Sequence, residues 1–370
     1  MNIIMFLAKE YKTDPRVKKE AQSLQKVGHQ VTVISRRKQK GMADSEQVGG
    51  IAIHRIGNGT IAQTLPTMAM PAYYKMWWRS AARKAIQLHK EKPFEVIHCH
   101  DLDTLEAGVI VKKRKNLPLL YDSHEIYPAM VNNKTMANAL YNKEIKLAQY
   151  VDQFIAATEP IRKHLLSAAD KPATIIRNTS KLFIDTYYEP TDKTFSLFQL
   201  GALRKSRMMP EIVDILGRKK DIIFKIAGIN EDLYSVVEER SKQYENIHFL
   251  GTIPSKEIYP ETLRSHSNIA LLNVENRNDK ISLLNKQFEA MVCGRPIITS
   301  KHTYAGELTE KLKCGITTEN TEAKIHEAVN TLKEDDQLCK QLGKNGLDAA
   351  KSQFNWENEE KKLKEIFKNI

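Results

Sequence analysis

The sequence lacks features that would place it in several large classes of protein. Its four cysteines lie far apart without paired spacing, which argues against a disulfide framework and against a zinc site. No apolar run approaches the roughly 18 residues of a membrane helix, and the apolar run over residues 2–8 is too short for the core of a signal peptide. We therefore expect reduced, mostly buried thiols and a cytoplasmic location.

A glycine-rich phosphate loop is also missing. No G-x-G-x-x-G pattern follows the first expected strand, and the loop after it, residues 9–15, contains no glycine. The fingerprint of a dinucleotide-binding domain is therefore absent from the place where it would stand.

Positive charge is present in excess, and it is confined to one half of the chain. The net charge is +12. Residues 1–185 carry 29 lysines and arginines against 17 acidic residues, whereas residues 186–370 carry 28 of each. A basic first half indicates an anionic partner, such as a membrane surface, a lipid phosphate or a nucleic acid. Lysines that are simply solvated explain the charge equally well.

Apolar runs alternate with helical patterns in both halves of the chain. We expect strands over residues 2–8, 29–35, 48–56, 94–98, 117–121, 150–157, 173–177, 195–200, 222–226, 247–250, 268–274 and 296–298. This alternation predicts an α/β protein with parallel sheets, and its restart near residue 195 predicts two Rossmann-like, doubly wound domains. The expected organisation is a first domain at 1–185, a linker at 186–194, a second domain at 195–352 and a C-terminal helix at 353–370.

Polar residues follow two expected strands of the first half. His98, His100 and Asp101 end one strand, and Asp122 and His124 end the next along the chain. Open α/β sheets bind ligands at the carboxyl ends of their strands, so these residues predict a binding site. Metal binding by the histidines is one alternative, although their spacing fits no fixed ligand pattern. Hydrogen-bonded structural histidines are another.

The segment 285–298 reads as a short helix that is followed by a strand. Lys286 lies near the start of this helix, and Glu289 lies one turn later. A cation and a carboxylate in this arrangement suit an anion and a sugar hydroxyl held side by side. An ordinary charged pair on a surface helix has the same spacing.

A basic, aromatic helix is expected over residues 73–90. Trp77 and Trp78 gather toward one side, and Arg79 and Arg83 lie on another. This pattern is typical of a helix that rests in a lipid headgroup layer, which makes these four residues candidates for a membrane-facing surface. A helix that packs its aromatic face on a sheet has the same pattern.

Taken together, these motifs resemble the GT-B-type retaining glycosyltransferases that use nucleotide sugars, the large group called family 4. The resemblance rests on segments 14–21, 98–103, 121–125, 288–291 and 294–298, and it covers essentially the whole chain. It implies two Rossmann-like domains that face each other across a cleft, with the acceptor held mainly by the first and the donor mainly by the second. The C-terminal helix would cross back onto the first domain.

The resemblance also implies roles for particular residues. Glu289 would bind the ribose hydroxyls of the donor. Cations would neutralise the departing diphosphate, so that no metal and no cofactor are needed beyond a UDP- or GDP-sugar substrate. The implied donor-binding residues are Arg204, Arg207, Asn285, Lys286 and Glu289. His124 would be the catalytic residue near the transferred sugar, and the acceptor side of the cleft would include Lys12, Arg16, His100 and Asp101.

Two positions depart from the pattern of the group. Ile281 stands where many members carry a first glutamate, eight residues before Glu289. Met208 replaces the glycine that commonly follows the phosphate-binding basic residue. Because the glutamate pair is incomplete, a catalytically silent sugar-binding partner of another transferase is a further alternative.

The expected function is transfer of a sugar to a hydroxyl of a lipid-linked or polysaccharide acceptor, in cell-envelope glycan synthesis. Such an enzyme would be peripheral at the inner face of the plasma membrane. A nucleotide-sugar 2-epimerase of the same fold is one alternative. A basic nucleic-acid-binding protein is another, although no recognisable nucleic-acid-binding module is present.

Overall fold

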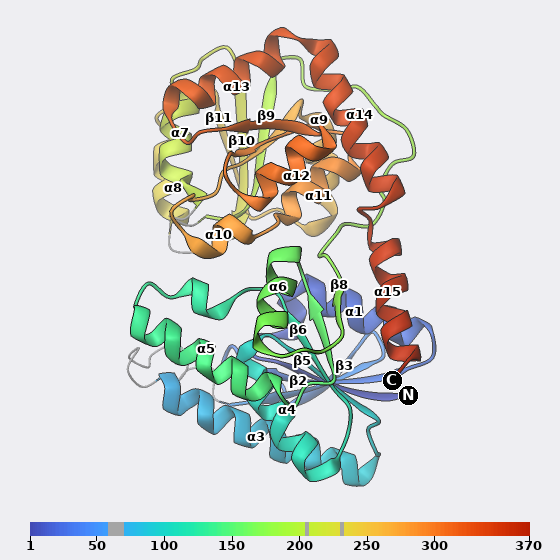
Figure 1. Ribbon diagram of the computed structural model, residues 1–370. Helices are drawn as coiled ribbons and strands as arrows, with labels where there is room; N and C mark the ends of the chain where they lie inside the picture. Colours follow the sequence, from blue (N-terminus) through green and yellow to red (C-terminus); the bar gives the residue numbers. More distant parts are fainter. Residues whose placement is uncertain (58–69, 204–206, 230–232) are drawn as a thin grey trace. The chain divides into compact units, whose positions relative to one another are not determined.

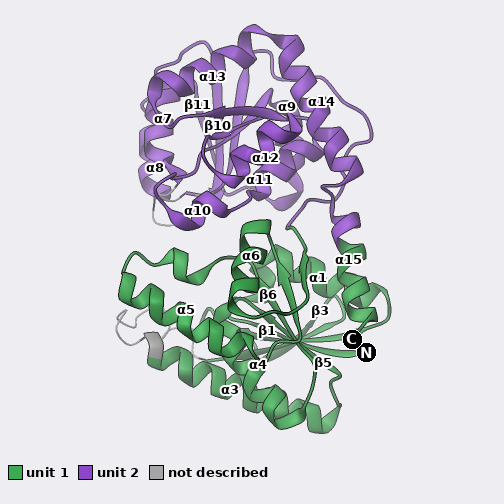
Figure 2. Cartoon of the chain, in the orientation of Figure 1, with its two compact units in different colours: residues 1–177, 360–370 green, residues 178–359 purple. Residues whose placement is uncertain are grey.

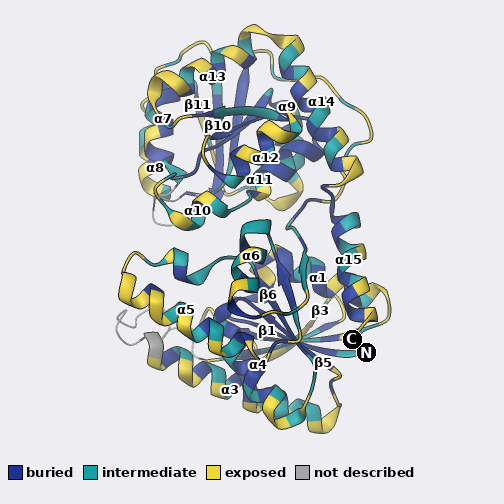
Figure 3. Cartoon of the chain, in the orientation of Figure 1, coloured by how far each residue is buried: buried dark blue, intermediate teal, exposed yellow. Residues whose placement is uncertain are grey.

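The computed structural model describes residues 1–57, 70–203, 207–229 and 233–370, which form two compact units. Unit 1 comprises residues 1–177 and 360–370, and unit 2 comprises residues 178–359 (Figure 2). The central strands of both units are buried, and the outward faces of the helices are exposed (Figure 3). Each unit therefore has a core of its own.

Unit 1 is built on an eight-stranded sheet in the order β3-β4-β2-β1-β5-β6-β7-β8, in which β3 alone runs antiparallel to its neighbour (Figure 1). Its strands are β1 (Asn2–Leu7), β2 (Gln30–Arg36), β3 (Ser45–Val48), β4 (Ile51–Ile56), β5 (Val96–His100), β6 (Leu119–Ser123), β7 (Gln153–Ala156) and β8 (Ala173–Ile175). Its helices are α1 (Pro15–Lys26), α3 (Met70–Glu91), α4 (Leu102–Lys115), α5 (Lys134–Ala148), α6 (Glu159–Ala168) and the end of α15 (Trp356–Lys368), with short 3₁₀ turns at Tyr11–Thr13 and Tyr127–Met130.

Strand β1 lies at the centre of the unit 1 sheet, between β2 and β5. Residues 3–7 are at most 1% exposed, as expected for a parallel strand covered on both faces. The chain moves outward to one side through β2 and to the other through β5, so the switch in strand order falls beside β1. This is the edge where a doubly wound sheet binds its ligand.

Local signals in the sequence set the start of helix α1, at this edge of the sheet. The Asp14 carboxylate accepts a hydrogen bond from the backbone N–H of Val17 at 3.0 Å, and Pro15 is the first residue of α1. An Asp cap followed by proline satisfies free N–H groups and presets the helical backbone. Helix α1 is thereby started with its first turn beside the end of β1.

Unit 2 contains a six-stranded sheet in the order β11-β10-β9-β12-β13-β14, and its strand pairs are parallel. The strands are β9 (Ser196–Ala202), β10 (Ile223–Ile229), β11 (Ile247–Gly251), β12 (Ser267–Ala270), β13 (Ile297–Ser300) and β14 (Gly315–Thr318). The helices are α7 (Met209–Gly217), α8 (Tyr234–Ser241), α9 (Ile258–Arg264), α10 (Arg277–Ile281), α11 (Asn285–Val292), α12 (Tyr304–Leu312), α13 (Glu322–Glu334) and α14 (Asp336–Ser352), with a 3₁₀ turn at Ser255–Glu257.

The expected linker at 186–194 needs a correction, because this segment belongs to unit 2. The buried Arg295 guanidinium donates to the carbonyl of Tyr188 at 2.8 Å, and the N–H groups of Thr191 and Asp192 donate to the carbonyl of Arg264. These bonds dock the segment on its own unit. The division of the chain falls between Arg177 and Asn178 instead.

The C-terminal helix α15 spans the second division, and residues 360–370 group with unit 1. There the ring of Phe367 lies 6.2 Å from the ring of His29 and 5.7 Å from the ring of His98, between centroids. Lys362 Nζ donates to the carbonyl of Ile175 at 3.5 Å. The end of the chain thus covers part of the unit 1 core.

Candidate active site

The polar edge of unit 1 is centred on the buried carboxylate of Asp122, at the end of β6. Arg16 Nη2 donates to Asp122 Oδ1 at 2.7 Å, and Arg16 Nε donates to Asp122 Oδ2 at 3.1 Å. Arg16 is 3% exposed and Asp122 is fully buried. Burial raises the pKa of Asp122, but Arg16 and then His124 outweigh it, so this pKa lies well below its usual range. Asp122 therefore remains an anion.

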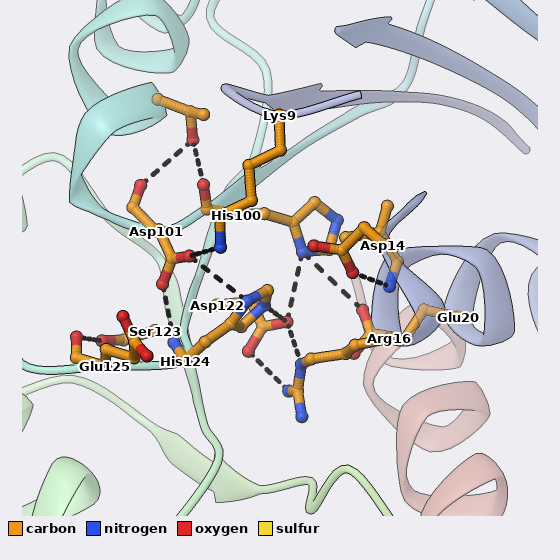
Figure 4. Close-up of polar contacts among 12 residues, drawn as sticks. Lys9, Asp14, Arg16, Glu20, His100, Asp101, Asp122, Ser123, His124 and Glu125 are labelled. Carbon is orange, nitrogen blue, oxygen red and sulfur yellow. Dashed lines mark hydrogen bonds and ion pairs between the residues drawn. The ribbon is translucent and has the colours of Figure 1, made fainter. Parts of the chain in front are cut away.

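His124 lies between two carboxylates (Figure 4). Its Nε2 is 3.0 Å from Asp122 Oδ2, its Nδ1 is 3.3 Å from Asp101 Oδ2, and its backbone N–H donates to Asp101 Oδ1 at 2.9 Å. Burial lowers the pKa of His124, but Asp101 and Asp122 together raise it to about 10. The imidazole is therefore a fixed cation at neutral pH, not a base.

This geometry limits the chemical roles that the His124 side chain can have. Both ring nitrogens face carboxylates, and the side chain is 12% exposed. The ring supplies a positive charge near the surface while both of its nitrogens hold the loop after β6 in place. A direct hydrogen bond from the ring to a sugar hydroxyl would require one of these contacts to open.

Asp101 is held in a backbone conformation that favours glycine. Its φ is +65° and its ψ is 164°, at the start of α4. A non-glycine residue in this region costs about 1–3 kcal/mol and persists only where its surroundings enforce it. The Asp101 N–H donates to the carbonyl of Asp122 at 2.8 Å, and its carboxylate holds His124. These contacts therefore hold the strained backbone of Asp101, which places the carboxylate that orients the histidine.

Lys9 and Asp103 were missing from the predicted site. Lys9 Nζ is 3.7 Å from Asp101 Oδ2, and the Lys9 side chain is 49% exposed. The Asp101 carboxylate raises the pKa of Lys9, so this amine is a cation at the open end of the cluster. Burial, together with Asp101, raises the pKa of Asp103 to about 7. The position of Lys9, two residues after β1, was the signal that could have identified it.

Three predicted acceptor-side residues of unit 1 occupy different places from those expected. Arg16 and His100 are buried, so neither lines an open surface, and this part of the prediction is wrong. Their charges and hydrogen bonds act through Asp122 instead. Lys12 is half exposed, but Lys12 Nζ pairs with Glu46 at 2.8 Å, on the other side of β1.

In unit 2, Lys286 lies against the end of β9. A Cβ atom placed on Gly201 would lie 2.7 Å from Lys286 Cε and 2.8 Å from Lys286 Nζ. Gly201 also has a φ of +127°, which a residue with a side chain rarely adopts. Glycine at this position is therefore what allows the ammonium to lie over the carboxyl end of the central strand.

Arg207 is half-buried beside α7 and forms an ion pair with Asp279 at 3.6 Å. The next residue, Met208, has a φ of +52°, in the left-handed region. The chain thus keeps the backbone conformation that glycine favours, although it carries methionine there. Arg204 lies outside the described residues.

Glu289 and Asn285 lie on α11. Glu289 is half-buried, and its charge helps to raise the pKa values of Tyr259 and Cys293, after the larger effect of burial. Asn285 is exposed, and its Oδ1 accepts a hydrogen bond from Asn178 Nδ2 at 3.0 Å. Ile281 is the last residue of α10, the helix that precedes α11.

The predicted membrane-facing surface on α3 is contradicted for its tryptophans. Trp77 is 2% exposed, next to Gly57. Trp78 Nε1 donates to the carbonyl of Asp103 at 2.5 Å, and the ammonium of Lys143 lies 3.3 Å from the centroid of its ring. The aromatic stripe packs inward because it covers α4 and the sheet, while Arg79 and Arg83 remain exposed.

Comparisons with known proteins agree with this architecture. The model of glycosyltransferase family 4 matches residues 16–179, and that of glycosyl transferases group 1 matches residues 189–348. A search of curated proteins gave no match.

Solved structures give the same fold. Sucrose-phosphate synthase from Thermosynechococcus elongatus matches with a TM-score of 0.80 at 15% identity, over 100% of this chain and 99% of its own. Anabaena HepE in complex with UDP-glucose matches with a TM-score of 0.72 at 15% identity, over 100% of both chains. WaaG, a glycosyltransferase involved in lipopolysaccharide biosynthesis, matches with a TM-score of 0.69 at 11% identity, over 99% of both chains.

Two Rossmann-like units with these two matching models define a GT-B-type glycosyltransferase that uses nucleotide sugars. The chain belongs to glycosyltransferase family 4, with a C-terminal unit of the glycosyl transferases group 1 type.

Proposed function

We propose that this enzyme transfers a hexose from a UDP- or GDP-sugar to a hydroxyl of a lipid-linked or polysaccharide acceptor, with retention of the anomeric configuration. The observation that carries the donor part of the proposal is the ammonium of Lys286 over Gly201, at the carboxyl edge of the unit 2 sheet. The UDP-glucose complex of HepE, which has this fold, supports a nucleoside diphosphate sugar as the donor.

The donor diphosphate would lie at the start of α11. The free N–H groups of a helix N-terminus and its dipole favour an anion, and Lys286 is the second residue of this helix. As the bond to the sugar breaks, negative charge grows on the diphosphate. Lys286 and Arg207 would stabilise that charge, which is the role of a metal in other transferases. Glu289 would accept hydrogen bonds from the ribose hydroxyls.

The polar edge of unit 1 would position the acceptor and supply positive charge. His124 is a cation with both nitrogens held, so it would stabilise negative charge rather than remove a proton. The base for the acceptor hydroxyl would then be a departing phosphate oxygen on the same face of the sugar, which gives retention. Lys9, which the buried Asp101 holds, would contact the acceptor side, since Lys9 is the exposed member of this cluster.

A basic hollow on unit 1 supports a membrane-associated acceptor. It has a volume of about 410 Å³ and is lined by Arg79, Arg83 and Arg114 from α3 and α4. Among the described residues, none of these three arginines has an ion-pair partner, whereas Glu106 in the same hollow pairs with Lys143 at 2.7 Å. Across the described part of the chain, every helix is too short or too polar to span a bilayer. Peripheral binding to anionic headgroups at the inner face of the plasma membrane fits these arginines.

The test of function is transfer of a labelled sugar from UDP- and GDP-hexoses to lipid extracts and to glycan acceptors. The proposal predicts an α-linked product from an α-linked donor, resolved by NMR of the anomeric proton. An epimerised sugar formed from the donor alone would replace this function with that of a 2-epimerase. No turnover, together with a salt-sensitive band shift on nucleic acid, would contradict it as well.

The membrane part is tested separately by flotation with anionic liposomes. The triple substitution of Arg79, Arg83 and Arg114 to Gln should reduce binding at low salt, since each basic residue contributes about 1 kcal/mol near an anionic surface. The matched control replaces three exposed lysines of unit 2, Lys256, Lys301 and Lys311, with Gln. Equal binding by both triple variants would contradict the proposal.

A further inference from the structure

Beneath Asp122 lies a second group of polar residues, which the proposed sugar transfer does not use. Glu20 projects from α1, and His98 and His100 project from β5. These three residues and Asp122 are fully buried, and one potential ligand atom from each of the four lies within 4.8 Å of the other three. Figure 4 shows the side chains of Glu20, His100 and Asp122 pointing toward one another.

The potential ligand atoms of these four residues surround one point. Glu20 Oε2 lies 3.8 Å from His98 Nε2 and 4.0 Å from His100 Nδ1. His100 Nδ1 lies 3.3 Å from Asp122 Oδ2. The two histidine rings are 4.2 Å apart between centroids, and the ring of Phe367 covers His98 at 5.7 Å. The point is therefore enclosed by the sheet, α1 and the end of α15.

Two of these four atoms, Glu20 Oε2 and His98 Nε2, lack hydrogen-bond partners among the described residues. Within the described part of the chain, neither oxygen of Glu20 and neither ring nitrogen of His98 forms a hydrogen bond. Glu20 Oε1 is 3.1 Å from Arg16 Nε in an ion pair, which leaves Oε2 facing the two imidazoles. Buried polar atoms are nearly always satisfied, so this concentration of unsatisfied atoms indicates a missing group.

We propose that Glu20, His98, His100 and Asp122 bind a divalent transition metal ion of the zinc type. A tetrahedral zinc ion with bonds of about 2.0–2.1 Å holds its ligand atoms about 3.3–3.4 Å apart. The contact between His100 and Asp122 already has this length, and the two contacts of Glu20 Oε2 need to shorten by about half an ångström. Two imidazoles with two carboxylates suit zinc and similar metals better than Mg²⁺ or Ca²⁺, which prefer oxygen ligands alone.

The charge and burial of the site define its role. Two carboxylates offset the dication, although Arg16 competes for both of them. All four ligands are fully buried, so no position is open to substrate, and the site is structural rather than catalytic. Because Asp122 Oδ2 also contacts His124 Nε2 at 3.0 Å, the ion would fix the carboxylate that orients His124. This inference concerns unit 1 alone and does not depend on the identity of the sugar donor.

The test begins with the metal content of the untagged full-length protein after dialysis against metal-free buffer. We expect about one zinc-type ion per chain. Cobalt added to the metal-stripped protein should give the visible absorption bands of tetrahedral Co²⁺. The variants Glu20→Gln and His98→Gln should lose the ion, whereas His248→Gln, at an exposed histidine of unit 2, should retain it.

The cobalt spectrum of the unaltered protein keeps the test decisive if the buried variants fail to fold. A protein that carries no metal, gives no tetrahedral cobalt bands and shows the same melting temperature with and without zinc would overturn the proposal. The site would then hold a water molecule or a shared proton. Retention of the full metal content and of the cobalt bands in a folded His98→Gln variant would overturn it as well.

Discussion

The two sheet edges of this protein carry charged residues in contrasting ways. At the edge of unit 1, Arg16, Asp122 and His100 are buried and bonded mainly to one another. At the edge of unit 2, Lys286 and Arg207 are half-buried. Lys286 lies in the first turn of α11, and Arg207 lies just before α7. The first arrangement fixes geometry before any ligand arrives, whereas the second leaves cations near solvent, where a phosphate can reach them.

This difference predicts how each edge responds to substitution. A buried ion pair that loses one partner leaves an uncompensated charge in the interior, so changes in unit 1 should act first on stability. A partly exposed cation contributes little to stability, so changes in unit 2 should act first on ligand binding.

The largest effect is expected for Asp122→Asn. This change leaves the Arg16 guanidinium without its bidentate partner and His124 without one of its carboxylates. We expect the free energy of unfolding to fall by about 3–5 kcal/mol, measured by urea denaturation. The matched control is Asp221→Asn, at a half-exposed ion pair with Lys219 and Lys333, which should cost at most about 1 kcal/mol. Similar losses in both variants would remove the contrast between the edges.

A second large effect concerns the protonation of His124. Its folded pKa of about 10 lies above its ordinary value of 6.5, so the folded state holds this proton more tightly than the unfolded chain does. The resulting stabilisation is fully present below pH 6.5 and is lost as the pH rises toward 10. NMR of the ring carbons in metal-stripped protein should show His124 still protonated at about pH 8. The reference is His54, whose pKa burial lowers below its usual value; titration of both rings near pH 6.5 would contradict the account.

The smallest predicted effect lies at Met208, whose φ is +52°. Met208→Gly relieves the left-handed strain but removes packing against the unit 2 core, whereas Met208→Ala removes the packing and keeps the strain. The glycine variant should therefore be more stable than the alanine variant by about 1 kcal/mol in thermal unfolding. Alanine equal to or better than glycine would show that this backbone conformation is not enforced.

Much of the architecture was predictable, because strands and helices leave periodic patterns in the sequence. The two α/β units, the polar residues after β5 and β6, and the helix at residues 285–292 follow from such local patterns. The family motifs, in their order along the chain, added the GT-B class.

Burial and long-range pairing were not predictable in this way. Arg16 and Asp122 are 106 positions apart, and nothing in their local sequence shows that they meet in the interior. The stripe of Trp77 and Trp78 is the same for a helix on a membrane and a helix on a sheet, and only the packing on α4 decides between them. Glu20 carried a weak signal, since it lies one helical turn after Arg16.

The central claim is that the unit 2 edge is the donor site, and calorimetric titration with UDP, GDP and their sugars tests it most directly. A charged contact to phosphate is worth about 1.5–3 kcal/mol, so Lys286→Ala should weaken binding of the preferred nucleotide by about ten- to a hundredfold. Lys256→Ala, at an exposed lysine of the same unit, should bind as the unaltered protein does. Undiminished binding by a folded Lys286→Ala variant would contradict the account.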